Sequence, residues 1–410
     1  MRLAYQLALA AYEWLIRLAA LRSEKARQWI AGRENWEFRL AQAAAQRAER
    51  QPLAWFHCAS LGEYEQALPV IEQLRTKHPN YQVWVTFFSP SGMLNFKPTP
   101  LVDYADYLPL DLPQRAKRFL DITQPSVCYF VKYEIWHHYI ALISQRQIPL
   151  YLISAVFKPS HIYFKPWGAW FKKSLQRFTH IFVQDQGSLN VLHANGIEHA
   201  SISGDTRIDR VLQNFTENKL LPLVEQFLGP KKALVFGSAW EPEIEWAAKW
   251  IASHPEIPVI LAPHEVRPDF IRKVVERLGE NHCTLLSTGN PDPHKPVLII
   301  DSVGQLKHIY RYAKYAVVGG GFGSGLHNIL EPAVFGIPIF FGPQYAGFHE
   351  AVELVDKKAA FSIDRYESLE EAIDRFERNP MLLKIVSDVQ KWYVNANTGA
   401  SAKILAAQPQ

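Results

Sequence analysis

The chain has 410 residues, of which 48% are apolar and 20% charged. It is too long for one ordinary core and can bury two separate domains, or even three. This composition excludes disordered, collagen-like and low-complexity proteins. The three cysteines, Cys58, Cys128 and Cys283, are widely spaced, which argues against a disulfide framework and favours a reducing compartment. With a net charge of only +4, a broad nucleic-acid-binding surface is not expected.

Residues 3–21 form the most apolar stretch near the N-terminus and predict an amphipathic helix. Gln6, Glu13 and Arg17 fall on one face of this helix, whereas the opposite face carries Leu3, Leu7, Trp14, Leu18 and Leu21. A charged side chain near a bilayer centre costs about 2.5–3.5 kcal/mol, so we expect the helix to lie in the membrane interface rather than to span it. The alternative is an ordinary amphipathic helix packed on its own domain.

The charge of the chain is concentrated directly after this stretch. Residues 17–50 hold eight basic and four acidic residues, a surplus of four that equals the net charge of the whole chain. Basic residues behind an interfacial helix are attracted to anionic headgroups. We therefore expect the protein to sit on the cytoplasmic face of a membrane rich in anionic lipid.

Two series of short β-like runs alternate with longer helical patterns from residue 53 onward. The runs of the first series lie at residues 53–59, 83–88, 126–131, 149–156 and 180–184, and those of the second at 233–239, 258–263, 296–301, 315–321, 337–342 and 359–363. This alternation predicts an α/β protein with two doubly wound parallel-sheet domains that face a cleft.

The predicted organisation has four parts. Residues 1–30 form the amphipathic membrane helix, residues 31–213 the first Rossmann-like domain, and residues 233–410 the second, which includes the helices at the C-terminus. Between the domains, residues 214–232 contain Pro222, Gly229 and Pro230 and are the expected linker.

The first candidate site follows the first predicted strand, where Ser60 and Glu63 stand three residues apart. This spacing is typical of a capping box at the start of a helix. A carboxylate at the mouth of a cleft could also remove a proton from a hydroxyl nucleophile. The spacing alone favours the cap over the catalytic interpretation.

The second candidate site is the glycine run from Gly319 to Gly325, which is followed by His327, Asn328 and Glu331. A strand that runs through glycines into a helix suits a phosphate bound by backbone N–H groups. The run lacks the spacing of the dinucleotide fingerprint, and a plain glycine-rich turn explains it equally well. His137 and His138 are adjacent, so they make a poor metal pair, and no metal site is expected.

Eight segments in register resemble bacterial 3-deoxy-D-manno-oct-2-ulosonic acid (Kdo) transferases over nearly the whole chain. These segments are WFHCASLGE, VTFFSPSG, YLPLDLP, KYEIWHH, SGDTRID, the glycine run, HNILEP and GIPIFFGP. The resemblance implies the GT-B fold with an N-terminal membrane helix at the cytoplasmic face of the bacterial inner membrane. It further implies metal-independent, inverting transfer of Kdo from CMP-Kdo to a hydroxyl of the lipid A precursor, without any cofactor.

The resemblance also assigns site residues. It implies that Glu63 is the general base, that Glu134 is a second catalytic carboxylate, and that Arg207 supports the leaving phosphate. Acceptor contacts are implied for Ser60, Gly62 and Ser89. Donor contacts are implied for Ser238, Pro263, His264, Val303, Gly304, Gln305, Gly321, His327, Asn328, Ile329, Leu330 and Glu331.

Three positions depart from the family pattern: His264 stands for a usual arginine, Gln305 for a glutamate and Arg207 for a lysine. We expect nearby Arg267 to supply the missing cation. Two other functions remain open at this stage, a nucleotide-sugar 2-epimerase of similar fold and a non-catalytic membrane-bound protein that binds sugar nucleotides or lipids. The number of sugars transferred and the oligomeric state are not determined by the sequence.

Overall fold

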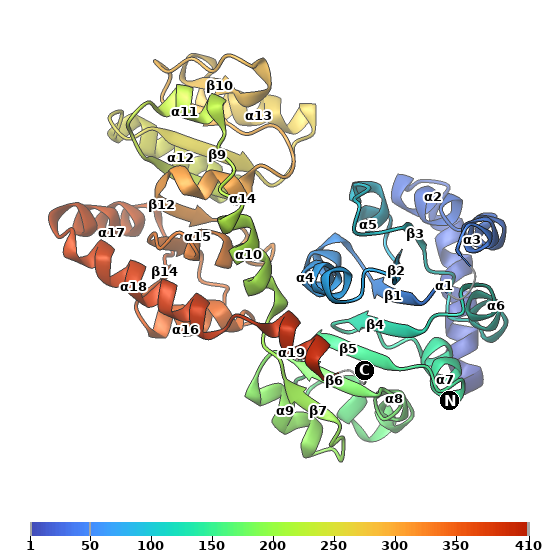
Figure 1. The fold of residues 1–410 in the computed structure, drawn as a ribbon. Coiled ribbons are helices and arrows are strands. Elements are labelled where there is room, and N and C mark those ends of the chain that lie inside the picture. Colours follow the sequence, from blue (N-terminus) through green and yellow to red (C-terminus); the bar gives the residue numbers. More distant parts are fainter. Residues whose placement is uncertain (1, 49–50, 408–410) are drawn as a thin grey trace. The chain divides into compact units, whose positions relative to one another are not determined.

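A computed structural model describes residues 2–48 and 51–407 of the chain (Figure 1). Glu49 and Arg50, which belong to the basic stretch, lie outside the described residues. Residue 1, in the predicted membrane helix, and residues 408–410, in the predicted second domain, also lie outside them. The chain divides into two compact units. The first comprises Met1–Arg210 and Thr398–Gln410, and the second comprises Val211–Asn397.

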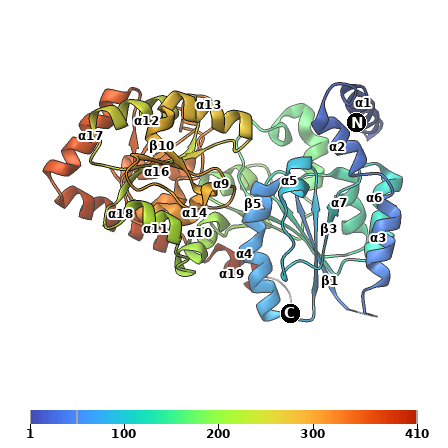
Figure 2. The ribbon, with the colours of Figure 1, turned by 90° about the horizontal axis from the view of Figure 1, so that it is seen from above.

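The first unit is built on a seven-stranded parallel sheet in the order β3-β2-β1-β4-β5-β6-β7. Apolar helices cover both faces, as buried parallel strands require. One face packs on α3, α6, α7, α8 and α9, and the other on α4 and α19. Figure 2 shows α3, α6 and α7 on one side of this sheet and α4 on the other. The strands are β1 (Leu53–Cys58), β2 (Gln82–Phe87), β3 (Tyr104–Tyr107), β4 (Val127–Val131), β5 (Leu150–Ala155), β6 (His180–Val183) and β7 (Ala200–Ile202). The helices are α1 (Arg2–Ala19), α2 (Glu24–Ala31), α3 (Trp36–Ala45), α4 (Leu61–Lys77), α5 (Pro90–Asn95), α6 (Pro113–Thr123), α7 (His137–Gln145), α8 (Ala169–Leu175), α9 (Gln186–His193), α10 (Thr206–Thr216) and α19 (Ala400–Ala406).

The second unit repeats this design with a seven-stranded sheet in the order β10-β11-β9-β8-β12-β13-β14. All of its strand pairs are parallel, so the predicted pair of doubly wound α/β domains is confirmed. The strands are β8 (Ala233–Ala239), β9 (Val259–Pro263), β10 (Cys283–Leu285), β11 (Val297–Ile299), β12 (Ala313–Val318), β13 (Ile339–Phe341) and β14 (Phe361–Ser362). The helices are α11 (Pro222–Leu228), α12 (Glu241–Ser253), α13 (Pro268–Leu278), α14 (Leu306–Ile309), α15 (Leu330–Ala333), α16 (His349–Asp356), α17 (Tyr366–Arg378) and α18 (Met381–Ala396).

The observed units differ from the predicted domains at two places. Residues 214–232, expected to be a linker, contain α11, whose Val224, Phe227 and Leu228 are buried in the core of the second unit. The chain instead enters the second unit between residues 210 and 211, within α10. The C-terminal helix α19 belongs to the first unit and not to the second, because its Ile404 and Leu405 are buried against the α4 side of the first sheet.

The strand order places a topological switch point in each unit. In the first sheet the chain starts in the middle at β1, adds β2 and β3 on one side, and then continues with β4 on the other side. In the second sheet β8 holds the corresponding position between β9 and β12. Ligands of open α/β sheets bind outside the carboxyl ends of the strands at such points. The residues after β1 and β4, and those after β8 and β12, are therefore where sites are expected.

Helix α1 directs Gln6 and Glu13 toward the first unit and exposes several large apolar side chains to solvent. Gln6 lies 3.4 Å from His138, and Glu13 forms an ion pair of 3.0 Å with Arg115. Leu3, Leu7, Trp14, Leu15, Leu18 and Leu21 are exposed. Arg17, which was predicted to share the polar face, is 64% exposed and pairs with Glu13, so the outward side of the helix is mainly but not wholly apolar. No helix within residues 2–48 and 51–407 combines the length and the apolar character needed to cross a bilayer.

Much of the basic surplus after α1 is used inside the first unit. Arg33 donates to the carbonyl oxygens of Phe88 at 2.7 Å and Leu108 at 2.9 Å, and Arg39 forms an ion pair of 2.8 Å with Asp106. Further cations engage the fold or a neighbouring carboxylate, namely Arg47, Arg17 and Arg27. The expectation that this stretch as a whole meets anionic headgroups therefore needs correction, since several of its cations are occupied.

Buried titratable groups beneath α1 predict a loss of stability in acid. Burial lowers the pKa of His137 and of His138 to about 4, and burial raises the pKa of Asp111 to about 6. Between pH 6.5 and 4 the unfolded chain binds two protons at these histidines that the folded chain does not, which lowers stability as the pH falls. Asp111 works in the opposite direction, because the folded carboxyl takes up its proton first, but it supplies only one proton.

We therefore expect the urea midpoint to fall from pH 6.5 to pH 4.5. The net uptake of one proton on unfolding corresponds to a loss of unfolding free energy of about 1.4 kcal/mol per pH unit. A variant with glutamine at both positions, His137→Gln/His138→Gln, should lose this dependence and reverse its sign, because only the opposing effect of Asp111 remains. His193→Gln, which alters an exposed histidine of the same unit, serves as the control. Equal slopes for the double variant and the control would show that the buried pair does not control the acid transition.

Candidate functional site

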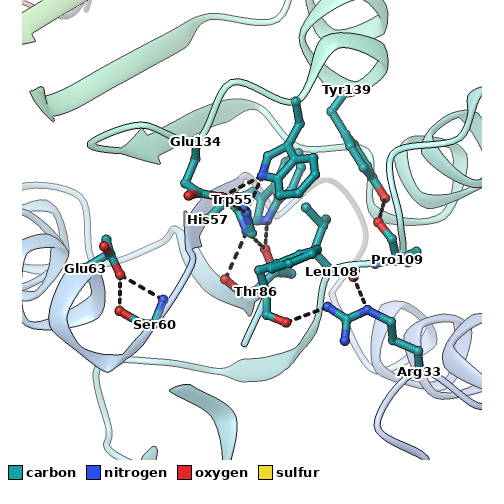
Figure 3. Close-up of polar contacts among 12 residues, drawn as sticks. Arg33, Trp55, His57, Ser60, Glu63, Thr86, Leu108, Pro109, Glu134 and Tyr139 are labelled. Carbon is teal, nitrogen blue, oxygen red and sulfur yellow. Dashed lines mark hydrogen bonds and ion pairs between the residues drawn. The ribbon is translucent and has the colours of Figure 1, made fainter. Parts of the chain in front are cut away.

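Glu63 lies in the first turn of α4, immediately after the carboxyl end of β1. Its Oε2 accepts a hydrogen bond of 2.9 Å from the backbone N–H of Ser60 and is also contacted by the Ser60 hydroxyl (Figure 3). The capping interpretation of this pair is confirmed. Both of these bonds use Oε2, and within the described part of the chain Oε1 has no hydrogen-bond partner. The same carboxylate can therefore cap the helix with one oxygen and accept a proton with the other.

A buried network at the ends of β1 and β4 holds the second carboxylate. The Nε2 of His57 lies 3.0 Å from Oε2 of Glu134, and the indole N–H of Trp136 donates to the same oxygen at 2.7 Å. On its other side, Nδ1 of His57 lies 2.9 Å from Oγ1 of Thr86, which accepts from the indole N–H of Trp55 at 2.8 Å. With Nε2 protonated, His57 is the middle of a continuous chain that ends on Glu134 (Figure 3).

His57 and Trp136 are functional candidates that the sequence reasoning missed. His57 is completely buried, and its ring lies 5.4 Å from the ring of Phe130. The signal was present, because the histidine stands in a strand of otherwise apolar residues and faces the same direction as Trp55. A buried polar side chain in such a strand requires a partner, and here that partner is the carboxylate.

The carboxylates and Arg207 act on common neighbours. Burial raises the pKa of the Cys58 thiol, and both Glu63 and Glu134 raise it further. Burial also raises the pKa of Tyr133, where the charges of Asp185 and Glu63 add to this effect and the charge of Arg207 opposes it. Glu63 and Glu134 thus share one neighbour, Cys58, and Glu63 and Arg207 share another, Tyr133.

Arg207 is bound by a neighbouring carboxylate rather than held ready as an isolated cation. Its Nε donates to Oδ2 of Asp205 at 2.8 Å, and its Nη2 forms an ion pair of 2.6 Å with the same oxygen. This pairing fixes the guanidinium at the start of α10 and reduces the charge that it presents. A role in supporting a leaving phosphate stays a prediction.

The predicted acceptor residues lie beside Glu63. The backbone N–H of Ser89 donates to the carbonyl oxygen of Ala59 at 2.8 Å, which places the start of α5 against the turn that holds Ser60. Ser89 caps α5 by accepting from Gly92 at 3.2 Å. Gly62 is exposed, so this part of the turn is accessible.

In the second unit, the predicted residue Ser238 lies at the end of β8, where the strand closely approaches the segment that contains Tyr310. Ser238 adopts a left-handed conformation with φ of +52°, which is unusual for a residue with a side chain and is found at functional sites. Its neighbour Gly237 faces the hydroxyl of Tyr310, where a Cβ would come within 1.9 Å of the phenolic oxygen. Only glycine fits at this position.

The glycine run after β12 bends sharply and then approaches the next strand. Gly320 has φ of +91°, and its N–H donates to Oε1 of Glu243 at 3.2 Å. A Cβ at Gly321 would come within 2.6 Å of the backbone nitrogen of Gly342. The fold therefore requires glycine at positions 320 and 321, which supports the interpretation of the run as a glycine-rich turn. The exposed tip of the run, formed by Gly323, Ser324 and Gly325, remains accessible to a ligand.

An aromatic cluster in the second unit joins three strand ends. His264, which follows Pro263 at the end of β9, stacks on Trp240 with ring centroids 4.0 Å apart. His327 lies 4.8 Å from His264, and Trp240 donates to its Nε2 at 3.4 Å. Burial lowers the pKa of His264 and lowers that of His327 to about 4. Both imidazoles are therefore neutral at pH 7. Trp240 was not predicted as a site residue.

The segment after the glycine run brings two polar side chains close together. Asn328 Nδ2 lies 3.5 Å from Oε1 of Glu331, and Asn328 Oδ1 accepts from the backbone N–H of Leu330 at 3.1 Å. Ile329 and Leu330 are completely buried, so their side chains anchor the segment. Their predicted donor contacts could only be made through the backbone.

The remaining predicted donor residues lie in the loop before α14. Val303 and Gly304 are exposed, and Gln305 carries a buried Oε1 that has no hydrogen-bond partner in the described part of the chain. A buried acceptor without a partner is costly unless a ligand or water supplies a donor. Arg267, which we expected to supply a cation, is highly exposed and forms an ion pair of 2.6 Å with Glu265. Its charge is therefore already partly compensated.

Comparison with known proteins agrees with the resemblance found in the sequence. Residues 34–210 match the family described as 3-deoxy-D-manno-octulosonic-acid transferase (kdotransferase). A 3-deoxy-D-manno-octulosonic acid transferase from Aquifex aeolicus is 27% identical over 313 residues, which cover 75% of this chain and 80% of that protein. The protein of the same name from Haemophilus influenzae is 26% identical over 335 residues, or 78% of each chain.

Solved structures agree with the fold. A UDP-GlcNAc 2-epimerase from Neisseria meningitidis, bound to UDP-GlcNAc, has a TM-score of 0.60 and 14% identity and covers 86% of this chain and 98% of its own. A structure described as the glycotransferase of kitacinnamycin has a TM-score of 0.53 and 16% identity, with 88% and 100% covered. At such low identity these likenesses concern the fold alone, which is of the GT-B type.

The matched residues 34–210 contain Glu63, Glu134 and Arg207, and the relatives extend into the second unit. The same assignment, a Kdo transferase, agrees with three observations. These are the two Rossmann-like units, the carboxylates at the β1/β4 switch point and the relatives that cover three quarters of the chain. The chain thus resembles the 3-deoxy-D-manno-octulosonic acid transferase family over most of its length, and these relatives support a glycosyltransferase.

Proposed function

We propose that the protein transfers Kdo from CMP-Kdo to a hydroxyl of the lipid A precursor at the cytoplasmic face of the bacterial inner membrane. The observation that carries this proposal is the pair of carboxylates, Glu63 and Glu134, at the switch point of the unit that matches the family. The outward apolar face of α1 supports an interfacial location. A single displacement would invert the anomeric carbon, and neither a metal ion nor a cofactor is required.

In the proposed reaction, Oε1 of Glu63 takes the proton of the acceptor hydroxyl while Oε2 remains bound to Ser60. The hydroxyl oxygen attacks the anomeric carbon of Kdo, and the bond from that carbon to the CMP phosphate oxygen breaks, so CMP leaves with the electron pair. Glu134, fixed by His57 and Trp136, supplies negative charge near an oxocarbenium-like transition state. Donor contacts are assigned to the second unit, where Gln305 offers an acceptor without a partner.

The test incubates the purified protein in detergent with CMP-Kdo and a tetra-acylated lipid A precursor, with EDTA present, and weighs the lipid products by mass spectrometry. One or more added Kdo masses are expected, and their number shows how many transfers occur. An unchanged lipid, with the protein folded and the donor intact, would refute the proposal. Conversion of a UDP-sugar without any acceptor would favour an epimerase, and donor binding without turnover would favour a binding protein.

His57 is expected to position Glu134, so replacing it should lower turnover more than substrate binding. His57→Leu removes both polar contacts from a completely buried site, and we expect kcat to fall roughly 10-fold to 100-fold, with a stability loss of about 1–3 kcal/mol. His57→Gln keeps a donor and an acceptor and should recover part of kcat. Steady-state kinetics check this order, and equal kcat values for the two variants would contradict the positioning role.

A further inference from the structure

The first unit contains a pocket of about 550 Å³ that no predicted site residue lines. It lies among the start of α1, the first turns of α6, the outer face of α7 and the end of α8, elements that lie near one another in Figure 1. Helix α7 follows directly on Trp136, so the pocket is adjacent to the carboxylate network in the chain. The two are separate, because none of the residues of that network lines the pocket. Nothing in the proposed reaction uses it.

The lining of this pocket is strongly cationic. Arg2, Lys117, Lys173 and Arg177 line it, and no aspartate or glutamate does. Lys117 forms an ion pair of 2.7 Å with Asp121, which does not line the pocket. For Arg2, Lys173 and Arg177, no carboxylate within residues 2–48 and 51–407 comes near enough to form an ion pair. Several uncompensated cations around one hollow produce a positive potential that attracts anions.

Arg177 adds a specific requirement for a ligand. Its Nη1 is buried and has no hydrogen-bond partner among the described residues. A buried guanidinium N–H without an acceptor is costly, and the planar guanidinium group suits two oxygens of one phosphate. Arg177 also lines the pocket, so its guanidinium group is available to an anion there.

Part of the pocket wall is formed by aromatic rings that pack on one another. The ring of His137 stacks on Trp170 with centroids 3.8 Å apart, and its Nδ1 lies 2.9 Å from Oγ of Ser174. The ring of Tyr5 packs against Trp170 at 5.2 Å, and its hydroxyl donates to Asp111 at 2.8 Å. These contacts fasten the start of α1 to α7 and α8.

Exposed apolar side chains flank the cationic lining. Leu3 and Leu7 follow Arg2 on α1 and are 69% and 61% exposed, and Trp167, just before α8, is 68% exposed. Because Tyr5 packs on Trp170, these residues belong to the same part of the surface. A phosphate group at the pocket would therefore sit beside side chains that favour acyl chains.

We propose that this pocket binds the phosphomonoester group of a membrane lipid. Such a group carries about −1.5 to −2 charges at pH 7 and three acceptor oxygens, enough to engage Lys173, Arg177 and Arg2 together. Binding would hold α1 and α8 at the bilayer surface by specific recognition rather than by diffuse attraction alone. The proposal goes beyond glycosyl transfer, because it involves none of the residues assigned to that reaction.

The test measures binding of the full chain, without donor, to vesicles in a flotation assay. One set of phosphatidylcholine vesicles contains phosphatidic acid, a phosphomonoester, and the other contains phosphatidylglycerol, a phosphodiester, at matched surface potential. We expect roughly tenfold tighter binding to the first set and loss of this preference in Lys173→Gln/Arg177→Gln. The control Lys165→Gln/Lys172→Gln removes the same charge from neighbouring positions outside the pocket and should keep the preference.

A second arm identifies the source of the phosphate. Calorimetry with inorganic phosphate and with glycerol phosphate shows whether the pocket also accepts a free phosphomonoester. Heat that is present in the native protein and in the control, but absent from the pocket variant, supports the site and adds a soluble ligand. No difference between pocket variant and control in either arm, or no preference for phosphatidic acid together with no heat, overturns the proposal. Both variants are compared by urea midpoint, so that misfolding is recognised.

Discussion

Replacing Glu63 by glutamine is expected to lower kcat by at least 10²-fold while the protein remains folded. A positioned general base contributes about 10²–10⁴-fold, and glutamine cannot accept the proton. Glutamine does preserve the capping box, because an amide oxygen at this position still accepts from the N-cap backbone. The two roles of Glu63 are therefore separated by one substitution, with activity lost and the helix end retained.

Steady-state transfer assays and thermal unfolding of the same preparations check this result. Glu65→Gln is the matched control, since it makes the same change in the same helix at a half-exposed side chain that pairs with Arg210 at 3.0 Å. We expect the control to keep near-native kcat, because surface ion pairs contribute little. Near-native transfer by Glu63→Gln would remove Glu63 from the mechanism and leave it as a helix cap.

The second large effect is expected at Asp209, where alanine should destabilise the first unit by about 3 kcal/mol or more. Asp209 is buried and accepts four hydrogen bonds from the segment that leads into α19. The backbone N–H groups of Gly399 and Ser401 donate to it at 2.7 Å each, and hydroxyls of Thr398 and Ser401 donate at 3.1 and 2.6 Å. Alanine would leave four donors without an acceptor.

Urea unfolding gives the size of this effect, and limited proteolysis locates it. In Asp209→Ala we expect early cleavage near residue 398, because α19 loses the bonds that fix its start. Asp388→Ala, which removes an exposed carboxylate of α18, should leave both readouts unchanged. Early cleavage elsewhere, with residue 398 still protected, would show that the buried face of α19 holds the segment without Asp209.

The fold was predictable where strands are central and apolar, and less so at the sheet edges. The strands that the hydrophobic pattern did not reveal are β3, β7 and β10, and each lies at the edge of its sheet. Edge strands are short and are buried on fewer sides, so the period-two signal is weak. In β3 the polar Asp106 is retained because it binds Arg39, a contact between positions 67 residues apart.

The candidate site was also predictable only in part. Glu63 and Asn328 were identified because they follow predicted parallel strands, whose carboxyl ends meet at one edge, whereas Glu134 was assigned by the resemblance to the transferases. The side chains that hold them were not, because the partnership of His57 with Thr86 and Glu134 depends on which strands become neighbours. The occupied state of Arg207, and the compensation of Arg267 by Glu265, are likewise properties of side-chain geometry that spacing does not reveal.

The return of α19 to the first unit determines the order in which the chain can fold during translation. The second unit is one continuous segment, residues 211–397, and contains all of its own core when it leaves the ribosome. The first unit is synthesised earlier, yet Ile404 and Leu405, which complete its core against α4, follow the whole of the second unit in the chain. The unit that begins first is therefore finished last, and its α4 face remains uncovered in the nascent protein until α19 arrives.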